Sequence, residues 1–170
     1  AVLRRVGKDA GRVPEWVDLH DLIQQELELL EAEGTIPPGV RVEQVLRAPV
    51  PMIFGIYGDF SRLLQGLLRH ALGGPMATEW VRLRTWREED VFHLEVLDEG
   101  GVIPPCELHG AFEPFSGLHQ TSVTGVRRPG EDLPVCRQIL APYQGTLEIR
   151  NAGDGTAVHA QFPLRTQEGS

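Results

Sequence analysis

The residues of this chain best placed to do chemistry lie between positions 96 and 115. An apolar segment ends at Asp98, and the pair Gly100-Gly101 follows it. Glycines let a backbone approach a ligand closely, and a carboxylate shielded from water is a strong hydrogen-bond acceptor. The structural alternative is that Asp98 caps a strand end, as aspartates before glycines commonly do. The stretch continues through Ile103-Pro104-Pro105 and ends on Phe112-Glu113-Pro114-Phe115.

This run resembles the nucleotide-pocket segment of sensor histidine kinases, which carry Asp-x-Gly-x-Gly-Ile-Pro followed by Phe-x-Pro-Phe. In that family the aspartate accepts a hydrogen bond from the adenine amino group. The resemblance therefore implies an adenine site made by Asp98, Gly100, Ile103 and Phe112. Val102 stands where the family has its second glycine. Since a β-branched residue is strained at positive φ, we expect this turn to have changed shape.

A second family box lies on the helix predicted to end at residue 72. In the family it reads Asn-Leu-Leu-x-Asn-Ala, and the last asparagine ligates the Mg²⁺ that bridges the phosphates. The resemblance places Gly66 and His70 at the two asparagine positions, with ATP and Mg²⁺ as the implied cofactors. Imidazole is a poor ligand for Mg²⁺, which prefers hard oxygens, and a lone helical histidine is more often structural. A register shifted by one turn changes nothing, because the only asparagine in the chain is Asn151.

The third box of the family, Gly-x-Gly-Leu-Gly-Leu, wraps the phosphates at a helix N-terminus, where free N–H groups and the helix dipole favour anions. The resemblance places these residues at the phosphates: Arg127, Arg128, Gly130 and Leu133. Pro134 lacks an N–H donor, and Asp132 adds negative charge where a triphosphate would lie. For the two arginines, the alternative is that they are solvated loop residues.

The spacing of apolar residues predicts the elements that position these boxes. We expect helices over 19–33, from 59 or 61 to 72, and over 133–140; strands over 40–45 and 50–56; and hairpins over 81–96 and 146–164. Asp18 can cap the first helix, and Asp59 or Ser61 the second. This order predicts an α+β fold, a two-layer sandwich with about three helices on one face of a mixed, mostly antiparallel sheet. The Bergerat-type ATPases, which include histidine kinases, gyrase, Hsp90 and MutL, share this architecture.

Composition excludes several classes of function. The 170 residues are 41% hydrophobic and 24% charged, as in a soluble globular domain. The net charge of −8 argues against a nucleic-acid partner, and no apolar run is long enough to span a bilayer. We expect no membrane contact by this segment. Cys106 and Cys136 give neither a metal spacing nor a disulfide framework, so we expect packing roles and a reducing, cytoplasmic setting.

Histidine chemistry outside these boxes finds little support in the sequence. His20-Asp21 is superficially like a phospho-acceptor motif, but no proline follows at the right distance, so we expect a surface residue. The other histidines show no shared spacing and no triad pattern: His93, His109, His119 and His159. We therefore predict no catalytic side chain and no metal ligand in this segment.

The resemblance implies a domain of a two-component sensor that presents ATP to a histidine on separate dimerisation helices. We expect residues 1–14 to end such a helix and form a linker, 15–165 to form the ATP-binding domain, and 166–170 to be a tail. A response regulator and a homodimer are the implied partners. The altered boxes predict weak or lost ATP binding. The alternative is a pseudokinase or phosphotransferase-type module that binds protein partners and no nucleotide, and an anti-sigma-factor kinase is a third reading.

Overall fold

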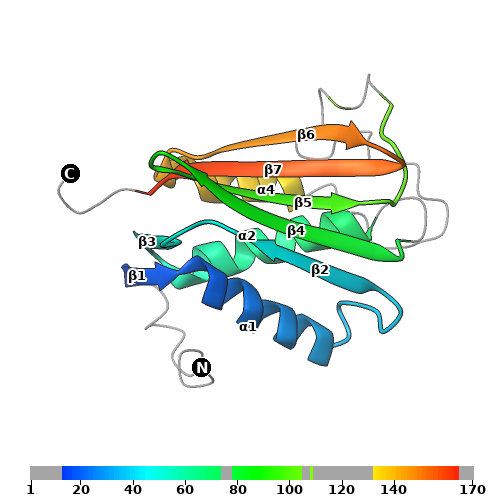
Figure 1. The fold of residues 1–170 in the computed structure, drawn as a ribbon, viewed down its shortest axis with the longest axis horizontal. Coiled ribbons are helices and arrows are strands. Elements are labelled where there is room, and N and C mark those ends of the chain that lie inside the picture. The colour runs from blue at the N-terminus through cyan, green and yellow to red at the C-terminus, as the bar shows by residue number, and fades with distance from the viewer. Residues whose placement is uncertain (1–12, 74–77, 105–107, 109–131, 165–170) are drawn as a thin grey trace.

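The computed structural model describes residues 13–73, 78–104, 108 and 132–164. Within them, a five-stranded sheet in the order β2-β4-β5-β7-β6 forms one layer of the molecule (Figure 1). The strands are β2 (Arg41–Leu46), β4 (Trp80–Glu88), β5 (Val91–Asp98), β6 (Thr146–Ala152) and β7 (Gly155–Pro163). Strand β2 pairs parallel with β4, and the other neighbours pair antiparallel. The predicted α+β sandwich with a mixed, mostly antiparallel sheet is confirmed.

The second layer consists of helices packed on one face of this sheet. They are α1 (Leu19–Ala32), α2 (Tyr57–Leu72) and α4 (Asp132–Leu140), and a short 3₁₀ helix, η5 (Ala141–Tyr143), follows α4. Helix α2 buries a stripe of leucines at helical spacing, and alternate residues of β4 and β5 face it from the sheet. Among the described residues, no helix is both long and apolar enough to cross a membrane.

A two-stranded ribbon stands apart from the main sheet, formed by β1 (Glu15–Asp18) and β3 (Met52–Gly55). The sequence did not predict β1, because a four-residue strand that buries only Val17 shows no alternation. Strand β3 is shorter than the predicted 50–56, since Val50 adopts a φ of 45°. Trp16 and Phe54 meet edge to face across this ribbon, with ring centroids 5.5 Å apart.

The caps of the two long helices differ in origin. Asp18 caps α1 as predicted, accepting from the backbone N–H groups of His20 and Asp21 at 3.0 and 3.1 Å. Helix α2 starts earlier than predicted, and neither predicted capping residue holds its start. Instead, the Ile56 N–H donates to the hydroxyl of Tyr143 at 3.0 Å. This hydroxyl comes from η5, so local sequence could not reveal the cap.

The hydroxyl of Tyr143 also donates to Asp59 Oδ2 at 2.7 Å, which ties η5 to the first turn of α2. Burial raises the pKa of Tyr143 to about 12, so the hydroxyl stays protonated and can donate. The phenol ring packs on Phe60, with centroids 4.7 Å apart. The element that follows α4 therefore fixes where α2 begins.

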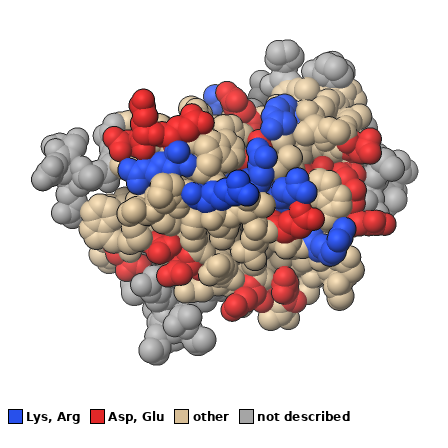
Figure 2. Space-filling model, viewed as in Figure 1, with Lys and Arg blue, Asp and Glu red and all other residues tan. Residues whose placement is uncertain are grey.

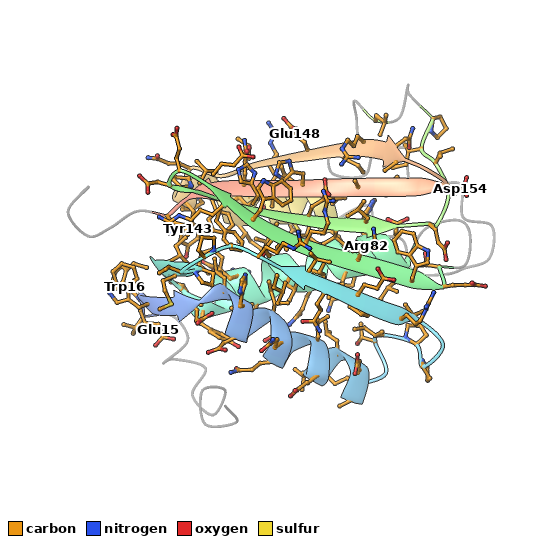
Figure 3. All side chains as sticks on the ribbon, viewed as in Figure 1. Glu15, Trp16, Arg82, Tyr143, Glu148 and Asp154 are labelled. Carbon is orange, nitrogen blue, oxygen red and sulfur yellow. The ribbon has the colours of Figure 1, made fainter. Side chains whose placement is uncertain are left out.

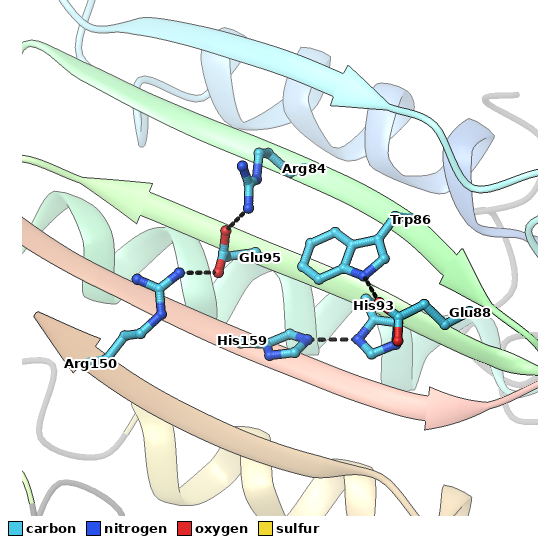
Figure 4. Close-up of polar contacts among 7 residues, drawn as sticks. All are labelled: Arg84, Trp86, Glu88, His93, Glu95, Arg150 and His159. Atoms are coloured by element: carbon cyan, nitrogen blue, oxygen red, sulfur yellow. Dashed lines mark hydrogen bonds and ion pairs between the residues drawn. The ribbon is translucent and has the colours of Figure 1, made fainter. Parts of the chain in front are cut away.

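The face of the sheet that the helices leave uncovered carries charged and aromatic side chains (Figure 3). A band of basic side chains crosses this face, with acidic side chains around it (Figure 2). The carboxylate of Glu95 is only 3% exposed and lies between Arg84 at 2.6 Å and Arg150 at 2.7 Å (Figure 4). Arg82 pairs with Glu43 at 2.8 Å. Cross-strand pairs of this kind stabilise a sheet face that meets solvent.

The same face brings together two histidines that no spacing in the sequence connects. His93 Nδ1 and His159 Nε2 lie 2.8 Å apart, so one ring donates to the other, and Trp86 stacks on His93 with centroids 4.9 Å apart (Figure 4). The pair is separated by 66 positions and arises from the pairing of β5 with β7. His20 also differs from its predicted surface role, since it is partly buried and its Nε2 lies 2.8 Å from the Thr85 hydroxyl.

Tyr143→Phe removes the hydroxyl that the Ile56 N–H and Asp59 share. We expect the free energy of unfolding to fall by about 1–2 kcal/mol, since a helix cap and a bond to a carboxylate are both lost. Urea denaturation followed by circular dichroism measures this. Tyr57→Phe is the matched control, because its hydroxyl makes a bond to Gln25 at 3.2 Å, and it should cost about 0.5 kcal/mol. Equal stability of wild type and Tyr143→Phe would contradict the capping role.

His159→Gln tests the histidine pair through pH. Burial lowers the pKa of His159, and His93 and Arg150 act in the same direction, while Glu95 and Glu148 oppose it. The unfolded chain therefore takes up this proton first, so stability is complete above pH about 6.5 and falls as the pH drops below it.

The His159→Gln variant should lose less stability than wild type between about pH 7 and 5 in thermal melts. The pH dependence of stability should become weaker in this variant without disappearing, because burial also lowers the pKa of His20. If the stability of the variant and of wild type changed equally with pH, His159 would not titrate between about pH 7 and 5.

Candidate functional site

Asp98 ends strand β5 with a carboxylate that is buried and held on both oxygens. Its side chain is 5% exposed. The Gly100 N–H donates to Oδ1 at 2.7 Å, and the Thr156 hydroxyl donates to Oδ2 at 2.8 Å. Burial raises the pKa of Asp98, and the hydrogen bonds from Gly100 and Thr156 act against this rise. The result is an acceptor of fixed position, shielded from water.

Strand β7 begins directly against the end of β5. A side chain on Gly155 would collide with the backbone carbonyl of Asp98, so only glycine allows this approach. Thr156, the next residue, then reaches the carboxylate. Sequence reasoning missed Thr156, because 58 positions separate it from Asp98 and no spacing rule links them. The available signal was a Gly-Thr pair that opens the last strand after a turn.

The loop after Asp98 has an unstrained backbone although Val102 replaces the second family glycine. The positive φ of this turn, 105°, falls on Gly101, and Val102 is not among the described residues with positive φ. Val102 is instead 55% exposed, so its side chain points into solvent. Val102 is therefore not strained in this turn.

Ile103, another predicted site residue, is buried and fastened to strand β6. Its N–H donates to Asn151 Oδ1 at 2.8 Å, and Asn151 Nδ2 donates to its carbonyl at 2.8 Å. The Gly101 N–H donates to the carbonyl of Asp154 at 3.1 Å. The β6–β7 hairpin therefore holds the loop, and Asn151 is a second residue that sequence reasoning missed as part of the site.

The positions of the second box, Gly66 and His70, lie on α2 and form a separate group. A Cβ on Gly66 would lie 2.6 Å from Cys136 Sγ, so a side chain at position 66 would require Cys136 or α4 to shift. Cys136 is buried as predicted, and its thiol lies 3.6 Å from the Leu63 carbonyl. Burial raises the pKa of this thiol to about 12, so it stays protonated. His70 is buried, at 6% exposure.

The start of α4 places core residues where the third box would bind phosphate. Leu133 is fully buried and belongs to the hydrophobic core. Asp132, the first residue of the helix, is also buried, and Pro134 removes one N–H from the first turn. The remaining predicted residues lie outside the described part of the chain: Phe112, Arg127, Arg128, Gly130 and Cys106. Over the described residues, no group of three or more His, Cys, Asp or Glu side chains suits a metal ion.

Asp98→Asn tests the cost of burying this carboxylate. Because burial raises the pKa above its ordinary value of 3.8, the folded chain holds the proton where the unfolded chain has lost it. The contribution of Asp98 to stability is therefore best below pH 3.8 and is lost as the pH rises through the folded pKa. We expect the Tm of Asp98→Asn, relative to wild type, to improve as the pH rises from about 3.5 to 7. A relative Tm that falls over this range would contradict the burial argument.

Comparison with known proteins places this architecture in a family. Residues 56–166 match the family described as Histidine kinase-, DNA gyrase B-, and HSP90-like ATPase. Sensor protein KdpD of Escherichia coli K12 is 29% identical over 147 residues, which cover 84% of this chain and 15% of KdpD. The chain thus spans a small part of the length of this relative.

Two solved structures share the fold. The mycobacterial sensor histidine kinase MprB superposes with a TM-score of 0.74 at 24% identity, covering 89% of this chain and 99% of that one. Histidine kinase ThkA, in complex with response regulator protein TrrA, superposes with a TM-score of 0.71 at 16% identity, covering 89% and 42%. The chain belongs to the histidine kinase-, DNA gyrase B- and HSP90-like ATPase family, as a domain of the type found in sensor histidine kinases.

Proposed function

We propose that this chain is the ATP-binding-type domain of a two-component sensor histidine kinase whose Mg-ATP binding is weak or lost. The observation that carries this proposal is the contrast between two parts of the same site. The base end, around Asp98, is held by neighbouring strands over its described residues. At the metal end, Gly66 packs closely against Cys136 of α4, and His70 stands where the family has its Mg²⁺-ligating asparagine.

The base end has the chemistry to recognise an amino group. Asp98 is a buried acceptor, and a ligand that left it unpaired would forgo a hydrogen bond in a shielded site. The exocyclic amine of adenine is such a donor. Gly100 and Gly101 leave the backbone beside Asp98 free of side chains. These features support Asp98, Gly100 and Ile103 as the residues that would face the base.

The metal end does not fit Mg²⁺. Among the described residues, the candidate donors there are the imidazole of His70, the protonated thiol of Cys136 and the carboxylate of Asp132. Mg²⁺ requires near-octahedral oxygen ligands, so this set offers one suitable group. The same carboxylate repels a triphosphate at the helix start that should attract it. Each defect costs on the order of 2–3 kcal/mol, which together would move a micromolar site beyond millimolar.

The partners follow from the kind of protein that carries such a domain. We propose that residues 1–14 lead from upstream dimerisation helices, that residues 15–165 form the domain, and that 166–170 are a tail. The phospho-acceptor histidine and the contact with a response regulator would lie outside this segment. An alternative is a docking or regulatory module without nucleotide, and the tight contact of Cys136 with Gly66 favours it.

Calorimetric titration with ADP, with and without Mg²⁺, tests the proposal. We expect dissociation constants near or above about 1 mM and a change of less than threefold on adding Mg²⁺. A micromolar affinity that depends on Mg²⁺ would overturn the proposal. A wild-type Tm in the same buffers confirms that the domain is folded.

The double variant His70→Asn with Asp132→Gly restores the family residues at both positions. It should strengthen Mg-ADP binding by about tenfold or more if these side chains are the obstacle. Arg69→Asn is the matched control, since it adds an asparagine at an exposed neighbouring position of α2 and should change nothing. No gain in the double variant would place the obstacle at the contact of Gly66 with Cys136.

A further inference from the structure

Asn151 fastens the loop that carries the base end of the site. Its side-chain amide pairs with both the N–H and the carbonyl of Ile103, at 2.8 Å each. Residues 99–103 lie beyond the end of β5 and, in the described part of the chain, have no neighbouring strand to pair with. The side-chain amide of Asn151 provides the donor and the acceptor that a strand would otherwise provide to Ile103. The Gly101 N–H, which donates to the Asp154 carbonyl, adds a second attachment to the same hairpin.

The hairpin also holds the carboxylate itself. The Thr156 hydroxyl on β7 occupies one side of Asp98 Oδ2, and Gly155 brings the strand close enough for this bond. The acceptor and the loop beside it are therefore attached to the same two strands. None of these contacts involves α2 or α4. A site whose donors and acceptors are already in place loses less entropy on binding.

We propose that Asn151 latches residues 98–103 in the base-accepting form, so that the site takes adenine nucleosides through the base alone. This inference rests on the proposed function, which assigns Asp98 to the base. Adenosine then binds about as tightly as ADP, and Mg²⁺ makes no difference. Asn151 is a positioning residue, since it acts on the ligand through Ile103 and the backbone of the loop.

The chemistry of the acceptor defines the ligand class further. A carboxylate has about four lone-pair positions, and the donors from Gly100 and Thr156 leave capacity for an amine. Inosine carries a carbonyl where adenosine carries its amine, so it would place one acceptor against another. Sites built to bond a donor reject such analogues by a large factor, here about 100-fold or more.

The experiment is an NMR titration of the uniformly ¹⁵N-labelled chain with adenosine, inosine and ADP, the last with and without Mg²⁺. We expect adenosine and ADP to agree within about threefold and inosine not to bind at attainable concentrations. Amide hydrogen exchange at Gly101 and Ile103 is recorded on the same samples. Slow exchange at both amides in the free protein is the direct sign of the latch.

Three variants separate positioning from plain stability. Asn151→Ala should weaken adenosine binding by about tenfold or more and speed exchange at Ile103 by a similar factor. Asn151→Asp keeps the acceptor for the Ile103 N–H and loses the donor to its carbonyl, so its adenosine affinity and exchange rate should lie between those of wild type and Asn151→Ala. It replaces the alanine variant if that variant does not fold. Glu148→Ala, an exposed change on the same strand, is the control and should match wild type (Figure 3).

The outcomes are distinct. Adenosine binding that resists Asn151→Ala, or exchange at Ile103 that it leaves unchanged, overturns the latch. If adenosine fails to bind wild type, or if inosine binds equally well, the proposed adenine ligand is wrong. The proposal that Mg-ATP binding is weak or lost would still stand. Micromolar ADP that requires Mg²⁺ overturns both this inference and the proposed function.

Discussion

The site depends on the burial of one carboxylate, that of Asp98, at the end of strand β5. A buried carboxylate is stable only where donors surround it, and here Gly100 and Thr156 supply them. To bring Thr156 there, β7 must start against the end of β5, which only a glycine at position 155 permits. The order of the strands in the centre of the sheet is therefore coupled to the position of one acceptor.

A second constraint, the packing of α4 on α2, acts at the other end of the site. The absence of a side chain at Gly66 lets Cys136 fill the space between the two helices. This contact gives α2 a continuous apolar face and gives the core Leu133 and Leu140. The same contact leaves little room for a larger side chain at position 66.

Much of the fold could be predicted because its signals are local. Helix α1 follows from its leucine spacing and the Asp18 cap, and the hairpin of β4 and β5 follows from alternation of apolar and polar residues. The run from Asp98 to Ile103 could likewise be recognised in the sequence, because a motif of six residues is a local signal. What could not be predicted is held by residues far apart in the chain. Tyr143 caps α2 across 87 positions.

The contacts of Asn151 and Thr156 with the loop after β5 show the same limit for the site. They span 48 and 58 positions, so the sequence offered the residues without their partners. In the sequence, Asn151 is distinctive only as the one asparagine in the chain. The structure gives it a place beside the base end of the site.

A single site-resolved measurement tests the central claim, that the base end is kept and the metal end is lost. Backbone amide shifts are recorded as Mg²⁺ is added to the chain saturated with ADP as far as solubility allows. The account predicts ligand shifts at Gly100, Gly101 and Thr156 and no Mg²⁺-dependent shift at Gly66 or His70. Shifts at Gly66 and His70 that appear only with Mg²⁺ would contradict it.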